Sequence, residues 1–220
     1  MAVEVRTGPL GLELAVAGEP RGVSIDVDEI RRRVKQGRRL ALARACGVVP
    51  SAVAGASVLD AMAGLGVDGV TLACLGAHVT LVEREPSTFA VLVDGVDRAR
   101  VVLAPPGALE CIHGDAEDVM RSGKRFDVVY LDPMFPERSK RALPRLRAQV
   151  LGAAGTPDSD HARVLDLARG VARSRVVVKR RSKDPCVAKP DWSIRARSVR
   201  FDVYAAASTD PSRSGVGAVT

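Results

Sequence analysis

The segment VVYLDPMFP, residues 128–136, joins an apolar strand directly to an acid, a proline and an aromatic residue. A buried strand that ends at Asp132 brings a carboxylate to the edge of a sheet, and Pro133 stops further pairing because it has no backbone N–H. The Asp132 carboxylate and the Pro133 carbonyl can accept the two hydrogens of an exocyclic amine, while the Phe135 ring stacks on the base. Such a group suits methyl transfer from a sulfonium, because that leaving group departs readily and the amine needs positioning more than a strong base. A plain turn followed by a core phenylalanine is the competing interpretation.

Three further acids follow apolar segments in the same way. Asp60 opens the turn DAMAGLG, in which Gly64 and Gly66 let a ligand approach the backbone closely. Glu83 ends the next apolar segment, near the roughly 20-residue offset at which nucleotide-binding folds place a carboxylate on the ribose hydroxyls. A 2′-phosphate would be repelled there, so NADP is disfavoured. Asp115 either accepts a hydrogen bond from an adenine amine or caps the following helix, and both interpretations remain open.

Strands alternate with helices in the part of the chain that carries these acids. Apolar segments predict strands at 57–60, 78–83, 109–112, 126–131, 175–179 and 199–205. Helical periodicity and end signals predict helices at 67–75, 86–100, 115–121 and 158–172. Continuous apolar strands between helices indicate a parallel sheet that is covered on both faces. Ligands of such a sheet bind beyond the carboxyl ends of its strands, so we expect the acids to share one crevice.

Residues 1–50 have a different pattern from the rest of the chain. Two short alternating segments, 10–16 and 22–27, predict a small hairpin. A helical pattern with a basic face follows from Asp28 to Cys46. The expected organisation is an N-terminal part at 1–50 packed on the main domain, that domain at 51–208, and a flexible tail at 209–220.

The chain carries 33 Lys and Arg residues against 26 Asp and Glu residues, which gives a net charge of +7 and a pI near 9.7. This excess favours a polyanionic partner such as a nucleic acid. Three tracts, 31–39, 138–147 and 173–183, contain several basic residues and no acid. For the helix that contains the first tract, simple solvation of a charged face is an equally good explanation.

The four cysteines lie far apart without a C-x-x-C pair, which predicts reduced structural thiols and no metal site. No apolar run reaches the roughly 18 residues that cross a bilayer. The N-terminal segment also lacks the basic flank and apolar stretch of a signal peptide. We therefore expect a cytoplasmic protein with no membrane partner.

Taken together, these segments resemble the class I S-adenosylmethionine-dependent methyltransferases, and more narrowly the RsmJ family of small-subunit (16S) ribosomal RNA guanine-N2 methyltransferases. The matching segments, in the family's order, are RRRVKQGRR, DAMAGLGVDG, TLVEREP, CIHGDAED, VVYLDPMFPERSKRAL, RVVVKR and VRFDVY. The resemblance implies a Rossmann-like α/β fold with a mostly parallel seven-stranded sheet. It also implies transfer of a methyl group from S-adenosylmethionine to the N2 amine of one guanine in 16S ribosomal RNA or the small ribosomal subunit.

The resemblance implies site residues by position, with Asp132, Pro133 and Phe135 as the catalytic group. The implied cofactor site consists of Asp60, Gly64, Gly66, Val67, Asp68, Glu83, Arg84, Asp115, Ala116 and Asp132. The implied contacts to the RNA backbone are Arg38, Arg138, Lys140, Arg141, Lys179 and Arg180. The family usually has an arginine at the position of Val67 and two serines at 115–116. These departures leave the backbone contacts possible and change the side-chain contacts.

Three other functions are compatible with the sequence. An amino-methyltransferase that acts on DNA adenine or on a protein amide would use the same acid, proline and aromatic residues. An NAD-dependent reductase shares the parallel sheet and the ribose carboxylate, but the chain lacks G-x-G-x-x-G. An RNA-binding ribosome-assembly factor with a decayed cofactor pocket would account for Val67. The retention of Asp60, Glu83 and Asp132 argues against such decay.

Overall fold

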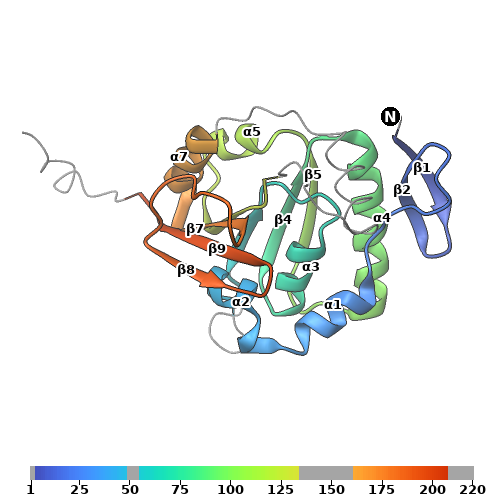
Figure 1. The fold of residues 1–220 in the computed structure, drawn as a ribbon, viewed down its shortest axis with the longest axis horizontal. Coiled ribbons are helices and arrows are strands. Elements are labelled where there is room, and N and C mark those ends of the chain that lie inside the picture. The colour runs from blue at the N-terminus through green and yellow to red at the C-terminus, as the bar shows by residue number, and fades with distance from the viewer. Residues whose placement is uncertain (1–2, 49–54, 134–160, 208–220) are drawn as a thin grey trace, which may run out of the picture.

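The computed structural model describes residues 3–48, 55–133 and 161–207 (Figure 1). Its central sheet consists of β3 (Ser57–Asp60), β4 (His78–Glu83), β5 (Leu109–His113), β6 (Phe126–Leu131), β7 (Ala172–Arg181), β8 (Trp192–Arg195) and β9 (Val199–Ala205). The strand order is β5-β4-β3-β6-β7-β9-β8. The first five strands in that order pair in parallel, whereas β9 runs antiparallel to β7 and to β8. The predicted α/β fold with a mostly parallel seven-stranded sheet is confirmed.

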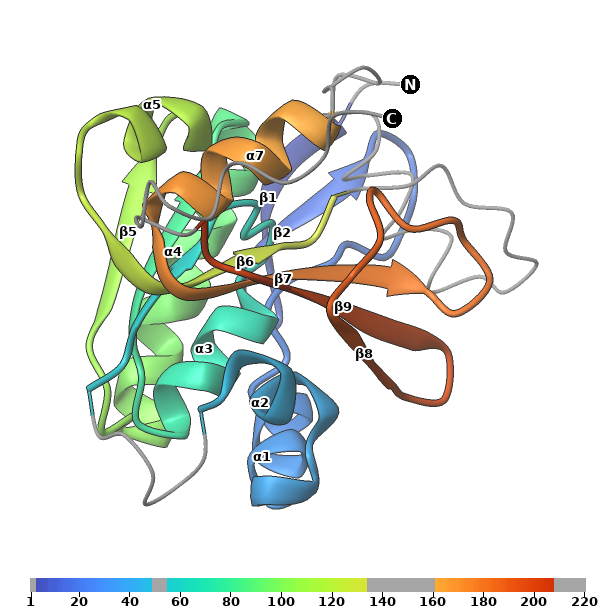
Figure 2. The ribbon, with the colours of Figure 1, turned by 90° about the vertical axis from the view of Figure 1, so that its left-hand side faces the viewer.

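Helices cover both faces of this sheet. They are α1 (Val27–Val34), α2 (Ala41–Cys46), α3 (Val67–Cys74), α4 (Pro86–Leu103), α5 (Ala116–Arg121) and α7 (His161–Val171). Because successive strand residues point to opposite faces, β6 contributes to two separate cores. Val128 and Tyr130 pack in one core with residues of α1, α2, α3 and α4, while Val129 and Leu131 pack in the other with α5 and α7. Figure 2 shows these two sets of helices on either side of the sheet.

Most of the strands lie where the sequence predicts them. The observed bounds of β3, β4, β6 and β9 coincide with the predicted ones, and β7 extends further at both ends. The prediction missed β8 at Trp192–Arg195, an edge strand whose residues are mostly exposed. Its apolar pattern is weak because an edge strand of four residues buries little surface.

The predicted hairpin at 10–16 and 22–27 is wrong in its pairing. The two strands are β1 (Val3–Gly8) and β2 (Gly11–Val16), joined by a tight turn in which Gly11 has a φ of 118°. Glycine adopts this conformation at little steric cost, which allows the chain to reverse here. Of the second predicted segment, Val23 alone bridges to β2, opposite Leu14.

The single helix predicted from Asp28 to Cys46 is also wrong, because the chain forms α1, the 3₁₀ turn η1 (Gly37–Arg39) and α2 in its place. Gly37 has a φ of 51° and Leu40 is extended, so the helical hydrogen bonding cannot continue through this stretch. Ile30 and Leu42 are nevertheless buried in the same core as Val58 of the central sheet. The division into domains stays a prediction.

The remaining helices agree with the prediction to within a few residues. The start of the predicted helix 158–172 falls partly outside the described residues, and α7 begins at His161. The predicted flexible tail, 209–220, lies outside them entirely. No helix in the described part of the chain is both long and apolar enough to cross a membrane.

Candidate active site

Four adjacent parallel strands end at one edge of the sheet. In the order β4-β3-β6-β7, they bring Glu83, Asp60, Asp132 and Lys179 to that edge. The register agrees, because Asp60 is opposite Leu81 of β4 and Tyr130 of β6, and Leu131 is opposite Val178. Parallel strands explain how residues so distant in sequence meet.

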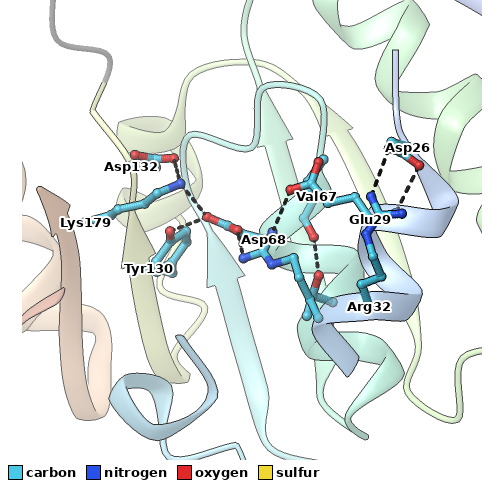
Figure 3. A network of polar contacts seen from close by, with 10 residues as sticks. Asp26, Glu29, Arg32, Val67, Asp68, Tyr130, Asp132 and Lys179 are labelled. Carbon is cyan, nitrogen blue, oxygen red and sulfur yellow. Dashed lines mark hydrogen bonds and ion pairs between the residues drawn. The ribbon is translucent and has the colours of Figure 1, made fainter. Parts of the chain in front are cut away.

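A network of buried charges joins these strand ends (Figure 3). Lys179 Nζ lies 2.8 Å from Oδ2 of Asp132 and 2.8 Å from Oδ2 of Asp68. The hydroxyl of Tyr130 donates to the same oxygen of Asp68 at 2.5 Å. Arg33, from α1, forms an ion pair with Oδ1 of Asp68. Asp68 is therefore the centre of the network, with cations on both of its oxygens.

Asp68 is ionised in spite of its burial. Burial disfavours the charged carboxylate, but the cations of Lys179 and Arg33 and the Tyr130 hydrogen bond outweigh it and hold the pKa of Asp68 well below its usual range. Asp68 also lies in the first turn of α3, where the helix dipole favours negative charge. The anion at this position is consequently well compensated.

Asp60 has the opposite environment. Its side chain is buried, and within the described part of the chain its Oδ1 has no hydrogen-bond partner. Burial and the charges of Asp68 and Asp132 raise the pKa of Asp60 well above its usual range. Of the cations in the network, Lys179 acts on Asp60 and opposes this rise in part.

The electrostatic environment of Asp132 is intermediate between those of Asp68 and Asp60. Burial and the charge of Asp68 raise its pKa, whereas Lys179 opposes the rise. The side chain of Asp132 is 34% exposed, compared with 10% for that of Asp68. Pro133, directly after it, is buried. The structure thus gives Asp132 both a fixed cation and an open side.

The glycine loop between β3 and α3 lies beside Glu83. Gly64 has a φ of 53°, and a Cβ atom added there would meet no heavy atom within 4 Å, so the backbone is open to a ligand. Gly66 has a φ of 78° and leaves no room for a side chain, because an added Cβ would lie 2.4 Å from Leu92. Oε2 of Glu83 accepts from the Gly64 N–H at 3.0 Å, and its Oε1 accepts from the Glu85 N–H at 2.8 Å. Glu83 therefore fixes the loop, and burial raises its pKa.

These residues fit S-adenosylmethionine. The open backbone at Gly64, the buried unpartnered oxygen of Asp60 and the carboxylate of Glu83 line one edge of the sheet. They offer hydrogen-bond acceptors that suit the hydroxyl and amino groups of a nucleoside with an amino-acid tail. In the described ranges, no group of three or more His, Cys, Asp or Glu residues is arranged to hold a metal ion.

Three other predicted cofactor residues lie near the ends of β4 and β5. Asp115 caps α5, since its side chain accepts from the Glu117 N–H at 2.7 Å, which is one of the two roles left open by the sequence. Ala116 is the first residue of α5. Arg84 is exposed, and its carbonyl is 3.1 Å from Nε2 of His113. Direct contact of these residues with the cofactor stays a prediction.

Lys179 and Arg180 do not face the same crevice, contrary to the expectation for these two RNA-binding candidates. They are consecutive in β7, so their side chains point to opposite faces. Lys179 pairs with carboxylates in the site, while Arg180 is buried elsewhere and donates to the carbonyl of Pro185 at 2.6 Å. Arg38 is exposed in η1. The residues Phe135, Arg138, Lys140 and Arg141 lie outside the described part of the chain.

The sequence did not identify Arg33 or Tyr130 as site residues. Arg33 lies in the basic tract 31–39, whose charge suggested a helix face that is solvated or binds RNA. Tyr130 has one usable signal, because a tyrosine two residues before Asp132 shares its strand face and a buried phenol requires a hydrogen-bond partner. Neither signal names Asp68 as the partner.

Comparison with known proteins agrees with this geometry. Residues 4–206 match the family model described as "Putative SAM-dependent methyltransferase". The Ribosomal RNA small subunit methyltransferase J of Pseudomonas paraeruginosa is 40% identical over 213 residues, which cover 91% of this chain and 81% of that protein. The protein of the same name from Thioalkalivibrio sulfidiphilus is 40% identical over 210 residues, which cover 88% of this chain and 81% of the relative.

A solved structure has the same fold. It is the SAM-dependent methyltransferase NGO1261 of Neisseria gonorrhoeae, which superposes with a TM-score of 0.69 at 28% sequence identity and covers 93% of this chain and 83% of its own. The match extends over both the central sheet and the N-terminal part, since it covers 93% of this chain. The chain therefore belongs to the family of S-adenosylmethionine-dependent methyltransferases that includes the Ribosomal RNA small subunit methyltransferase J proteins.

Proposed function

We propose that this protein transfers the methyl group of S-adenosylmethionine to the N2 amine of a guanine in small-subunit ribosomal RNA. The relatives' names support ribosomal RNA of the small subunit as the substrate. The sequence resemblance to guanine-N2 methyltransferases supports the N2 amine. The observation that carries the proposal is the position of Asp132 and Pro133, which follow a buried strand at the same edge of the sheet as the glycine loop.

The chain's own groups suit a weakly nucleophilic amine. Lys179 binds Oδ2 of Asp132, so Oδ1 is the oxygen that accepts a hydrogen from the guanine amine. The carbonyl of Pro133 accepts the second hydrogen and orients the nitrogen lone pair toward the donor. When bound, S-adenosylmethionine supplies an electrophilic methyl group on a sulfonium that leaves as a neutral thioether. The nitrogen becomes cationic as it gains the methyl group, and Asp132 is placed to take the proton that it then loses.

The net charge supports RNA as the substrate class. Arg33 and Lys179 in the site are already paired with Asp68, so the cations that bind RNA phosphates must be others. The acid-free tract 138–147 follows the Asp132 segment directly in sequence. We propose that this tract holds the RNA backbone while a guanine enters the site, and that the reaction takes place in the cytoplasm, where ribosomal subunits are assembled.

Methyl transfer to separated substrates tests the proposal. The wild-type protein and Asp132→Ala are incubated with labelled S-adenosylmethionine and with naked 16S RNA, small subunits, DNA or total protein. We expect label in RNA or subunits alone, recovered as N2-methylguanosine by mass spectrometry after nuclease digestion. Asp132→Ala is expected to lose at least about 100-fold in turnover while it retains its fold.

Other outcomes of this assay contradict the proposal in distinct ways. Label in adenine or in protein would replace the substrate. Label at another position of guanine would keep the RNA and reject the N2 amine. Calorimetry with S-adenosylmethionine completes the test, because a pocket that has decayed in a non-catalytic assembly factor would give no binding heat.

A further inference from the structure

Lys179 lies between two acids that belong to different parts of the site (Figure 3). Its Nζ is 2.8 Å from Asp132, which follows β6, and 2.8 Å from Asp68, which lies in the first turn of α3. The side chain of Lys179 is 26% exposed, and those of Asp132 and Asp68 are 34% and 10% exposed. The cation is therefore partly buried at the edge of the sheet, where it links the proposed acceptor acid to the first turn of α3.

We propose that Lys179 is a positioning residue for methyl transfer, which holds Asp132 as an oriented carboxylate with Oδ1 toward the guanine amine. Asp68 holds Lys179 in that place. This inference rests on the proposed function and adds to it the residue that prepares Asp132. It also replaces the role in phosphate binding that the sequence suggested for Lys179, since its ammonium already has two carboxylate partners.

The anchoring of Asp68 makes this arrangement rigid. A lysine has many rotamers, and its ammonium is a point charge without a preferred direction, so one carboxylate alone would orient it poorly. Here a second carboxylate restrains Lys179 from the side of α3. Asp68 is in turn restrained by Arg33 on Oδ1 and by the Tyr130 hydroxyl on Oδ2. The position of Asp132 thus depends on residues of β7, α3, α1 and β6.

The positive charge of Lys179 also favours the ionised form of Asp132. Among the described residues, the charged groups that act on Asp132 are Lys179 from β7, Asp68 from α3 with its partner Arg33, and Asp60 from β3. Tyr130 lies in β6, two residues before Asp132, and burial raises its pKa well above the usual range, so its phenol is neutral. Without Lys179, burial and the negative charge of Asp68 favour the protonated form of Asp132. A protonated carboxyl would place a hydrogen where the amine needs an acceptor.

Two substitutions are expected to move the pKa of Asp132 in opposite directions. Lys179→Met removes the nearby cation and raises this pKa by roughly 1–3 units. Asp68→Asn removes a neighbouring negative charge and leaves Lys179 to pair with Asp132 alone, so it lowers the same pKa. Lys179→Arg keeps the charge and keeps the pKa near that of the wild type. Lys189→Met, at an exposed lysine outside the network, is the matched control and leaves it unchanged.

The pKa is measured by ¹³C NMR titration of the Asp132 carboxyl carbon, assigned by its loss in Asp132→Asn, on the full chain without substrate. The pH dependence of turnover on small-subunit RNA is measured in parallel. In Lys179→Met the acidic limb of kcat moves to higher pH by the same 1–3 units, and kcat falls more than KM for S-adenosylmethionine rises. Lys179→Arg restores the limb while it recovers turnover in part, because the geometry differs.

The outcomes separate this inference from the proposed function. An Asp132 pKa that is equal in the wild type, Lys179→Met and Asp68→Asn overturns the role of Lys179. If Lys179→Met does not fold, Lys179→Gln, which keeps a polar side chain and removes the charge, decides the question: an Asp132 pKa equal to that of the wild type overturns the role of Lys179. If the variants show these pKa shifts and the wild-type protein nevertheless methylates no ribosomal RNA, the proposed function is rejected. The role of Lys179 in orienting Asp132 would then still stand.

Discussion

Arg33 of α1 forms an ion pair with Asp68 of α3, so a residue of the N-terminal part binds the first turn of the helix that follows the glycine loop. The side chains of Arg33 and Asp68 are 19% and 10% exposed. Removal of Arg33 leaves Oδ1 of Asp68 without its cation, while Lys179 and the Tyr130 hydroxyl still bind Oδ2. This ion pair adds to the apolar packing of α1 and α3 in the same core.

We predict that Arg33→Met lowers the free energy of unfolding by about 1.5–3 kcal/mol, the value for a lost hydrogen bond to a charged group, and weakens binding of S-adenosylmethionine. Arg32→Met is the matched control, because Arg32 is the adjacent arginine, is 67% exposed and lies 3.5 Å from Asp26. An exposed pair of this kind contributes about 0–1 kcal/mol. Urea unfolding and calorimetry measure the two effects, and equal losses in both variants would contradict the special role of Arg33.

Tyr130→Phe tests the hydrogen bond between the buried phenol and Asp68. The substitution removes one oxygen and keeps the ring, so it removes a hydrogen bond to a charged acceptor and costs about 1.5–3 kcal/mol of unfolding free energy. Tyr204→Phe is the control, because its hydroxyl donates to a neutral carbonyl, that of Ala188, at 3.1 Å and is expected to cost about 0.5–1.5 kcal/mol. Urea unfolding of both variants compares them. A Tyr204→Phe variant that is the less stable of the two would contradict the prediction.

The positions of the acids at the strand ends could be predicted from the sequence, whereas their partners could not. Asp60, Glu83 and Asp132 each follow a continuous apolar run, and the parallel arrangement of the strands then fixes their common edge. The pairing of Asp68 with Arg33 depends on how α1 packs on α3, and no local pattern encodes that packing.

The break between α1 and α2 was missed for a similar reason. A basic amphipathic pattern continues through Gly37, and one glycine within a helical pattern costs only about 1 kcal/mol relative to alanine. Tertiary packing decides the matter, because Ile30, Leu40 and Leu42 must all reach the core below the sheet. A continuous helix through Gly37 and Leu40 would follow a different path.

Asp60 makes the stability of the protein without cofactor depend on pH. Its folded pKa is raised above the unfolded value of about 3.9, so the folded state binds more protons than the unfolded state between these two values. The contribution of Asp60 to stability is therefore complete below the unfolded pKa and is lost as the pH rises through the folded pKa. We predict that Asp60→Asn, which is neutral at every pH, removes this loss and flattens the curve of unfolding free energy against pH above about 4.

Chemical denaturation across a pH series without S-adenosylmethionine measures this effect. The folded pKa of Asp68 is lowered, so its contribution to stability is present above the unfolded pKa and is lost as the pH falls. Asp68→Asn is therefore expected to remove the loss of unfolding free energy on the acidic side of the curve. Parallel curves for Asp60→Asn and the wild type would mean that Asp60 is ionised in the folded protein.

The acid-free basic tract 138–147 follows the Asp132 segment in sequence. Simultaneous replacement of Arg138, Lys140 and Arg141 by alanine is expected to weaken binding of small-subunit RNA and to reduce the slope of log K against log salt. Each phosphate contact releases counterions, so three lost contacts reduce the magnitude of the slope by roughly 2–3. The control replaces Arg121 and Lys124, which are exposed and pair with acids of their own. Binding is measured by filter retention at several salt concentrations, and binding of S-adenosylmethionine is expected to be unchanged in every variant. An equal salt slope in the wild type and the triple variant would assign RNA binding to another surface.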